Sequence, residues 1–188
     1  MRAHNTNVAS GRRGTRQRRT VPILALIALL VIGAAVGVLA ARTSLFGART
    51  AEEAPGARLA DQGNLHIPTL DAPHEPYNSD PPTSGPHVGY IAPWGVHTRP
   101  IPRELQVHNL EDGGVLVQYS CDCPDVVDKL AAIVRKYDRF VILAPYPAMK
   151  SRIALTAWTR IDTMEEVDAP RITRFIEAYR GLDHHPVR

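Results

Sequence analysis

The longest apolar run of the chain lies near its N-terminus. Residues 21–41 hold 21 residues without a charge, and at about 1.5 Å per helical residue this length matches the hydrocarbon thickness of a bilayer. We therefore expect a transmembrane anchor at 21–41. A cleaved signal peptide, with Val38-Leu39-Ala40 as its cleavage site, is the alternative, although the run exceeds the usual apolar core of about 7–15 residues.

Charge indicates which way this segment is inserted. Residues 1–20 contain six arginines and no acidic residue, so the positive-inside rule predicts a basic cytoplasmic tail. Everything after Arg42 then lies outside the cytoplasmic membrane, on the periplasmic or extracellular side. The formal net charge of +3 is concentrated in this tail. It therefore indicates the membrane topology of the chain rather than nucleic-acid binding.

The next part of the chain is irregular. Residues 42–64 are rich in Ala, Gly, Arg and Glu and are predicted to be a linker, followed by a folded domain over 65–188. Nine prolines between Pro68 and Pro102 exclude long helices or central strands there. A long proline-rich loop segment that wraps the rest of the domain is expected.

From Val115 onward the pattern becomes regular. Short β-branched apolar runs predict buried strands, and apolar residues at helical spacing predict two amphipathic helices. The expected elements, in order, are a strand at Val115–Tyr119, a helix from Pro124 to Tyr137, strands at Phe140–Ala144 and Arg152–Arg160, and a helix from Asp168 to Gly181. This β-α-β-β-α order predicts an α+β fold with two helices on one side of a small sheet.

Histidines and acids suggest a metal site. His108, Glu111 and Asp112 have the spacing that places side chains on one side of a turn or short helix, and His87 follows a tight turn. Three or four such ligands from separate loops are typical of metal centres. A structural role in capping or loop hydrogen bonds, and direct acid/base catalysis, remain the alternatives.

The two cysteines form a Cys121-Asp122-Cys123 sequence before Pro124. A thiol at a helix start has a lowered pKa, which allows a redox role, and a thiolate pair with Met149 nearby would suit a soft ion such as Cu(I). A labile disulfide between residues so close in sequence is the third alternative. The position is similar to the redox cysteines of thioredoxin-like proteins, except that the spacing is C-x-C.

Four motifs together resemble the bacterial domain of unknown function 3105 family. They are PPTSGPH (Pro81 to His87), APWGVH (Ala92 to His97), VHNLEDGG (Val107 to Gly114) and APYPAM followed by RIALTAW (Ala144 to Trp158). The resemblance runs from about His66 to Arg180 and implies a short membrane anchor followed by a single domain. Its usual pattern reads HNLEHGG, so that Asp112 here stands where the family has histidine.

The remaining side chains add little to a site. His97 is expected to face solvent, and His184-His185 to form a solvated tail or to add one ligand. We expect Trp94, Trp158, Tyr77 and Tyr90 to pack in the core.

The sequence therefore leaves three functional hypotheses open. The leading hypothesis is binding or handling of a metal ion, copper first and zinc second, through His87, His108, Asp112, Cys121 and Cys123, with Glu111 and Met149 as further candidate ligands. The rivals are a thiol–disulfide redox protein and a non-catalytic assembly module at the membrane face. The chain contains no P-loop, GxGxxG, HExxH or GxSxG motif, so no nucleotide or organic cofactor is indicated.

Overall fold

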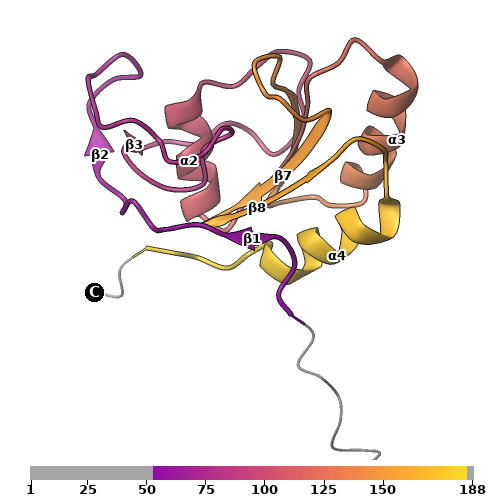
Figure 1. Cartoon of the computed structure of the whole chain (residues 1–188). Helices are drawn as coiled ribbons and strands as arrows, with labels where there is room; N and C mark the ends of the chain where they lie inside the picture. The colour runs from indigo at the N-terminus through magenta and orange to yellow at the C-terminus, as the bar shows by residue number, and fades with distance from the viewer. Residues whose placement is uncertain (1–52, 186–188) are drawn as a thin grey trace, which may run out of the picture. The chain divides into compact units, whose positions relative to one another are not determined.

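Short β-branched runs build a six-stranded sheet within the part of the chain that the structure describes. A computed structural model describes residues 53–185, and its main sheet has the strand order β1-β8-β7-β5-β6-β4, of which Figure 1 labels β1, β8 and β7. The strands are β1 (Ala57–Arg58), β4 (Gly95–Val96), β5 (Val115–Tyr119), β6 (Val141–Pro145), β7 (Ile153–Ala157) and β8 (Arg160–Met164). The mixed α+β content confirms the class expected from the sequence.

Connections follow from the pairing. β5 and β6 are parallel and therefore need a crossover, which α3 (Pro124–Val134) provides. β7 pairs antiparallel with β5 and forms a hairpin with β8. The predicted strand at Arg152–Arg160 is thus split, because a turn at Trp158 and Thr159 separates β7 from β8 and Thr159 has a positive φ of 58°.

The two faces of the sheet bury different layers. Val115 and Val117 pack in one apolar cluster with residues of α3 and of α4 (Ala169–Tyr179). Leu116 and Ile142 point the other way and pack with residues of α2 (Arg103–Glu111). Two helices do share one face, as the sequence predicts, and a third helix covers the other.

The helix at 103–111 is not predicted by the sequence, for a physical reason. Within α2 the buried residues include Gln106, His108, Asn109 and Glu111, so the inward face is largely polar and carries no apolar periodicity. The polar side chains find partners instead. Gln106 Nε2 donates to the Ile101 carbonyl at 2.6 Å and Gln118 Nε2 donates to Gln106 Oε1 at 3.0 Å.

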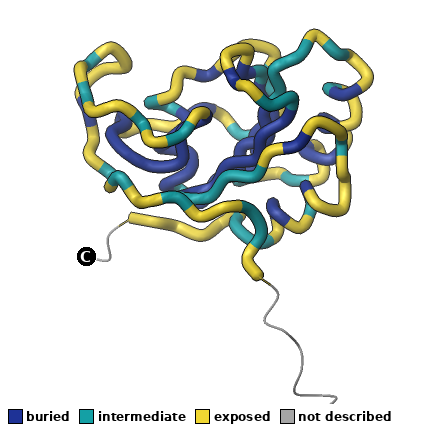
Figure 2. The backbone as a smooth tube through the Cα atoms, viewed as in Figure 1, coloured by how far each residue is buried: buried dark blue, intermediate teal, exposed yellow. Residues whose placement is uncertain are grey.

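The proline-rich segment does more than wrap the sheet. Residues 81–88 are all buried, as the dark-blue stretch of the tube shows (Figure 2). Backbone bonds hold them there: the amides of Gly85 and His87 donate to the carbonyls of Gly63 and Leu65, each at 2.9 Å. A small parallel pair, β2 (His66–Ile67) and β3 (His87–Val88), results.

The start of the domain is a correction to the sequence analysis. Residues up to 64 were assigned to a linker, yet β1 pairs with β8 and the Gly63 carbonyl accepts the bond from Gly85. Two-residue strands carry no sequence pattern, so β1 could not be predicted from the sequence.

Within 53–185, no helix has both the length and the apolar character that crossing a bilayer requires. The expected anchor at 21–41 and the tail at 1–20 lie outside the described residues.

The C-terminal tail folds back on the turn between α2 and β5. The Gly181 amide donates to the Gly113 carbonyl at 2.7 Å, and the His184 amide donates to the Glu111 carbonyl at 2.9 Å. Gly113 has a φ of +81°, and a Cβ there would lie 2.7–2.8 Å from backbone atoms of Gly181 and Leu182. The close approach of the tail therefore requires glycine.

Two glycine variants separate conformational strain from this contact. Gly63 has a φ of +78° with nothing within 4 Å of a built Cβ, so Gly63→Ala should cost only the left-handed strain of about 1–2 kcal/mol. Gly113→Ala should cost this and a further overpacking penalty of about 1–3 kcal/mol. Urea denaturation midpoints at an unchanged m value measure the difference, and equal losses would show that the tail does not dock as described.

Candidate metal centre

The carboxylate of Glu111 lies at the centre of the site. It sits in the last turn of α2, and its side chain is 1% exposed. Asn64 Nδ2 donates to Oε1 at 2.8 Å. Oε2 faces four imidazoles, at 2.9 Å from His87 Nε2, 3.3 Å from His185 Nε2, 3.5 Å from His66 Nε2 and 3.6 Å from His108 Nδ1.

Three elements bring these side chains together. The β2–β3 register sets His66 directly opposite His87, so the two rings lie 4.9 Å apart between centroids. His108 and Glu111 are three residues apart on α2 and share one helix face. The His108 ring lies 5.1 Å from that of His87 and 5.2 Å from that of His66.

The buried His87 ring is oriented as a metal ligand would be. Its Nδ1 lies 2.8 Å from the Gly85 carbonyl oxygen, an acceptor that requires an N–H at Nδ1. In the neutral ring the lone pair is then on Nε2, which faces the carboxylate at 2.9 Å, and two acceptors at that distance require a proton or a cation between them. A histidine that donates one ring N–H to a backbone carbonyl and presents the other nitrogen is the usual arrangement at a metal.

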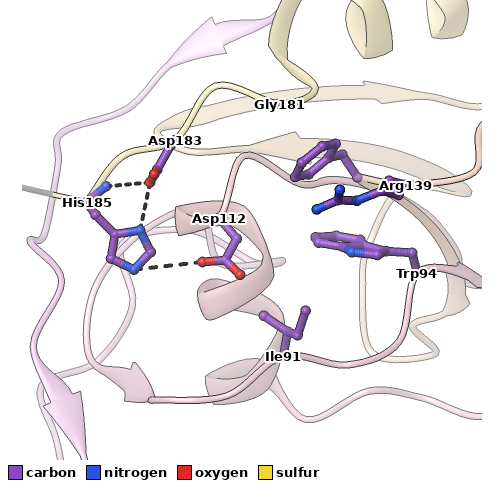
Figure 3. Close-up of a pocket in the computed structure, with 8 residues that line it drawn as sticks. Ile91, Trp94, Asp112, Arg139, Gly181, Asp183 and His185 are labelled. Carbon is purple, nitrogen blue, oxygen red and sulfur yellow. Dashed lines mark hydrogen bonds and ion pairs between the residues drawn. The ribbon is translucent and has the colours of Figure 1, made fainter.

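A second group of ligand atoms adjoins the first. Asp112 Oδ1 lies 3.9 Å from His108 Nε2 and 3.7 Å from His185 Nε2. Asp183 holds His185 in place, because its Oδ1 accepts from the His185 amide at 2.9 Å and from Nδ1 at 2.7 Å (Figure 3). In both groups the ligand atoms lie within 4.8 Å of one another, so that either group could hold a metal ion.

The electrostatics favour an ionised Glu111 and an uncharged His108. Burial raises the pKa of Glu111, but hydrogen bonds from Asn64 and His87 outweigh it and lower that pKa below its usual value. Burial lowers the pKa of His108 despite the opposing charge of Asp112. An ionised carboxylate and a neutral imidazole are the protonation states that bind metals.

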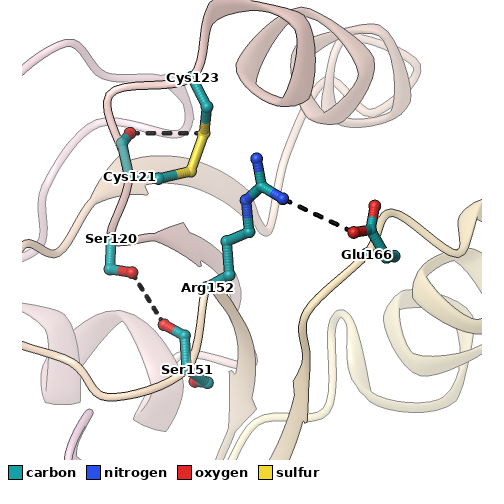
Figure 4. The surroundings of a disulfide bond; sticks show 6 residues. All are labelled: Ser120, Cys121, Cys123, Ser151, Arg152 and Glu166. Carbon is teal, nitrogen blue, oxygen red and sulfur yellow. Dashed lines mark hydrogen bonds and ion pairs between the residues drawn. A yellow bond between two sulfur atoms is a disulfide. The ribbon is translucent and has the colours of Figure 1, made fainter.

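The sequence-predicted residues fall into two sets. His87, His108, Glu111 and Asp112 meet as expected. Cys121 and Cys123 do not join them and instead form a disulfide with each other (Figure 4). Met149 is buried against Tyr146 and Ala154.

Chain direction explains this separation. Glu111 and Asp112 precede the first residue of β5, whereas Cys121 follows its last residue. The strand therefore places the acids at one end of the sheet and the thiols at the other. Met149 follows the end of β6, which runs parallel to β5, so it also lies at the far end.

Sequence reasoning missed two members of the site and left a third open. His66 and Asn64 lie before the recognisable motifs and have no local signal, since only the β2–β3 pairing brings them in. His185 had been assigned either to a solvated tail or to a ligand, and the docked tail places it against Glu111. His97 is separate from the cluster, and its Nε2 bonds to the Pro93 carbonyl at 2.7 Å.

Comparison with known proteins assigns a family. The family described as "Protein of unknown function (DUF3105)" matches residues 73–188. The chain belongs to the DUF3105 family. No curated protein and no solved structure matches this chain.

The DUF3105 motifs have structural explanations. In the HNLE segment, His108 and Glu111 belong to the candidate metal centre, and Asn109 holds the APWGVH loop. Asn109 Oδ1 accepts from the Ala92 amide and Nδ2 donates to the Ala92 carbonyl, both at 2.9 Å. PPTSGPH supplies His87 together with the Gly85 carbonyl that orients it.

Removing the central carboxylate tests whether it organises the site in the absence of metal. Glu111→Leu leaves Asn64 and His87 without their buried partner, so we expect a loss of about 3–5 kcal/mol in unfolding free energy. Urea denaturation in the presence of a chelator measures it. Glu104→Leu on the same helix is the control: Glu104 lies 3.5 Å from His74, both side chains are only partly buried, and the loss should be smaller than that of Glu111→Leu. Equal losses would contradict the central role of Glu111.

Proposed function

We propose that this DUF3105 domain binds a divalent transition-metal ion through His66, His87, His108 and Glu111. The observation that carries the proposal is the buried Glu111 oxygen facing imidazole nitrogens, with His87 oriented by the Gly85 carbonyl. Three imidazoles and one carboxylate match the number and type of ligands that such ions take in proteins.

The donor set disfavours Cu⁺, the form of copper that sulfur ligands would select. The argument for copper depended on sulfur, and both thiols and Met149 lie away from the histidines. Imidazole and carboxylate suit Zn²⁺ and Cu²⁺, whereas Cu⁺ prefers thiolate and thioether ligands. We therefore keep Zn²⁺ and Cu²⁺ as candidate ions, whereas the sulfur-bound copper site expected from the sequence loses its ligands.

Solvent reaches the ligand set from one side. The His87 and Glu111 side chains are 0% and 1% exposed, whereas that of His66 is 50% exposed. An ion can thus enter past His66 without opening the core. Such access supports reversible metal binding without catalytic turnover.

Metal titration of the full-length protein in detergent tests the proposal. We expect Zn²⁺ binding, with Glu111→Gln and His87→Ala each lowering the affinity by more than the roughly 10- to 100-fold that loss of an outer-shell partner costs. Glu111→Gln keeps the shape and removes the charge. Isothermal titration calorimetry with a competing chelator gives the affinities, and a wild-type protein that binds no metal would overturn the proposal.

Matched variants separate ligation from folding. His97→Ala should leave the affinity unchanged, as should a double variant of Cys121→Ser and Cys123→Ser, because neither set of atoms belongs to the cluster. If the histidines were only scaffold, Zn²⁺ would not raise the melting temperature of the wild type. A ligand that binds only the native state stabilises it, so we expect a rise that Glu111→Gln abolishes.

We also propose that the domain acts outside the cytoplasmic membrane, held by the segment at 21–41. The uncharged run and the arginine-rich residues 1–20 support this. A reporter fused after Arg188 should be active only outside the cytoplasm, and recovery of a soluble form that begins near Ala41 would show a cleaved signal peptide instead.

One observation favours a second candidate function, thiol–disulfide exchange. The Cys121–Cys123 disulfide is partly exposed and Cys123 immediately precedes α3, where exposed backbone N–H groups stabilise a thiolate. In exchange, a partner thiolate attacks one sulfur and the other leaves as a thiolate. Incubation with reduced glutathione followed by mass spectrometry should detect the mixed disulfide, and an inert disulfide would exclude this function.

A further inference from the structure

We propose a second metal position, formed by His108, Asp112 and His185 beside the first. The inference rests on the proposed function, because the two positions share His108. The ligand of this second position is a divalent cation of intermediate softness, of the same kind as the first. The ligand atoms of this group lie as close together as those of the first.

The C-terminal tail delivers His185 in a defined orientation. Two backbone bonds fix the tail on the α2–β5 turn, from Gly181 to the Gly113 carbonyl and from His184 to the Glu111 carbonyl. Asp183 accepts the His185 Nδ1–H at 2.7 Å, which leaves Nε2 facing Glu111 Oε2 at 3.3 Å and Asp112 Oδ1 at 3.7 Å. A carboxylate that orients a histidine in this way is a typical outer-shell partner of a metal ligand.

His108 lies between the two groups and faces both. Its Nδ1 is buried with no hydrogen-bond partner and points to Glu111 Oε2, whereas Nε2 points to Asp112 Oδ1. An unpartnered buried ring nitrogen needs an explanation, and a metal ion on that side supplies one. To be a ligand of both ions, His108 would have to release its ring N–H proton to water, so that each ring nitrogen could offer a lone pair.

The second position borders a cavity, whereas solvent reaches the first position past His66. Asp112 and His185 line a cavity of about 290 Å³ whose other wall includes Trp94, Phe140 and Arg139 (Figure 3). An ion held by Asp112 and His185 would therefore border solvent and keep exchangeable coordination positions, whereas the first ion lies against the fully buried His87. We expect the second ion to bind more weakly and to exchange faster.

Stoichiometry tests this inference directly. The full-length protein in detergent is titrated with Co²⁺, whose visible absorption reports ligand type, and with Zn²⁺ followed by elemental analysis. We expect two ions per chain in the wild type. Asp112→Ala and His185→Ala should each bind one ion, Asp112→Ala with the affinity of the first position unchanged, and His108→Ala should lose the second ion and weaken the first.

Two further variants distinguish positioning from folding. Asp183→Asn should weaken only the second ion, by about 10- to 100-fold, because it loosens the hold on His185. His184→Ala is the matched control: its ring stacks on Trp158 and contributes no ligand, so two ions should still bind. Asp112→His, which places the residue usual in the family pattern, should also keep two.

Failure of the second position and failure of the proposed function give different results. One ion per wild-type chain, unaffected by Asp112→Ala and His185→Ala, would overturn the second position and leave the proposed function standing. No ion at all would overturn both. Two ions with both of these variants still binding two would show that the second ion binds elsewhere, and would also overturn the inference.

Discussion

The rest of this structure depends on a buried carboxylate that must be neutralised. Moving an ionised acid out of water costs several kcal/mol unless charge and hydrogen bonds replace the solvent. Glu111 is compensated from four directions: by Asn64 before β2, by His87 on β3, by His108 on its own helix and by His185 on the tail. Glu111 thereby holds together segments that belong to no common helix or strand.

This requirement also explains why one layer of the domain looks unlike a core. The face of the sheet beneath α3 and α4 is lined with aliphatic side chains. The opposite face must accommodate the polar side of α2 and the proline-rich segment, and it does so with hydrogen bonds such as Gln118 to Gln106. Prolines suit the buried segment because each removes a backbone N–H that would otherwise need a partner.

The sheet separates two kinds of chemistry. Nitrogen and oxygen ligands gather where β5 begins, and the disulfide lies where β5 ends. The proposed metal site and the disulfide therefore lie at separate ends of this DUF3105 domain. A metal ion at the histidines would therefore meet imidazole and carboxylate ligands but no sulfur ligand.

The sequence by itself determined the elements whose signal is local. Apolar runs and helical periodicity located β5, β6, α3 and α4, because a strand or helix with one apolar face repeats on its own scale. Spacing alone also grouped His108 with Glu111 and Asp112. Tertiary structure decided what depends on contacts between distant segments. The buried face of α2 is polar and so has no period, the pairing of His66 with His87 rests on two-residue strands, and the tail reaches Glu111 only by backbone bonds to Gly113 and Glu111. The same holds for the cysteines: nothing in their spacing places them across the sheet from the histidines, and only the direction of β5 does.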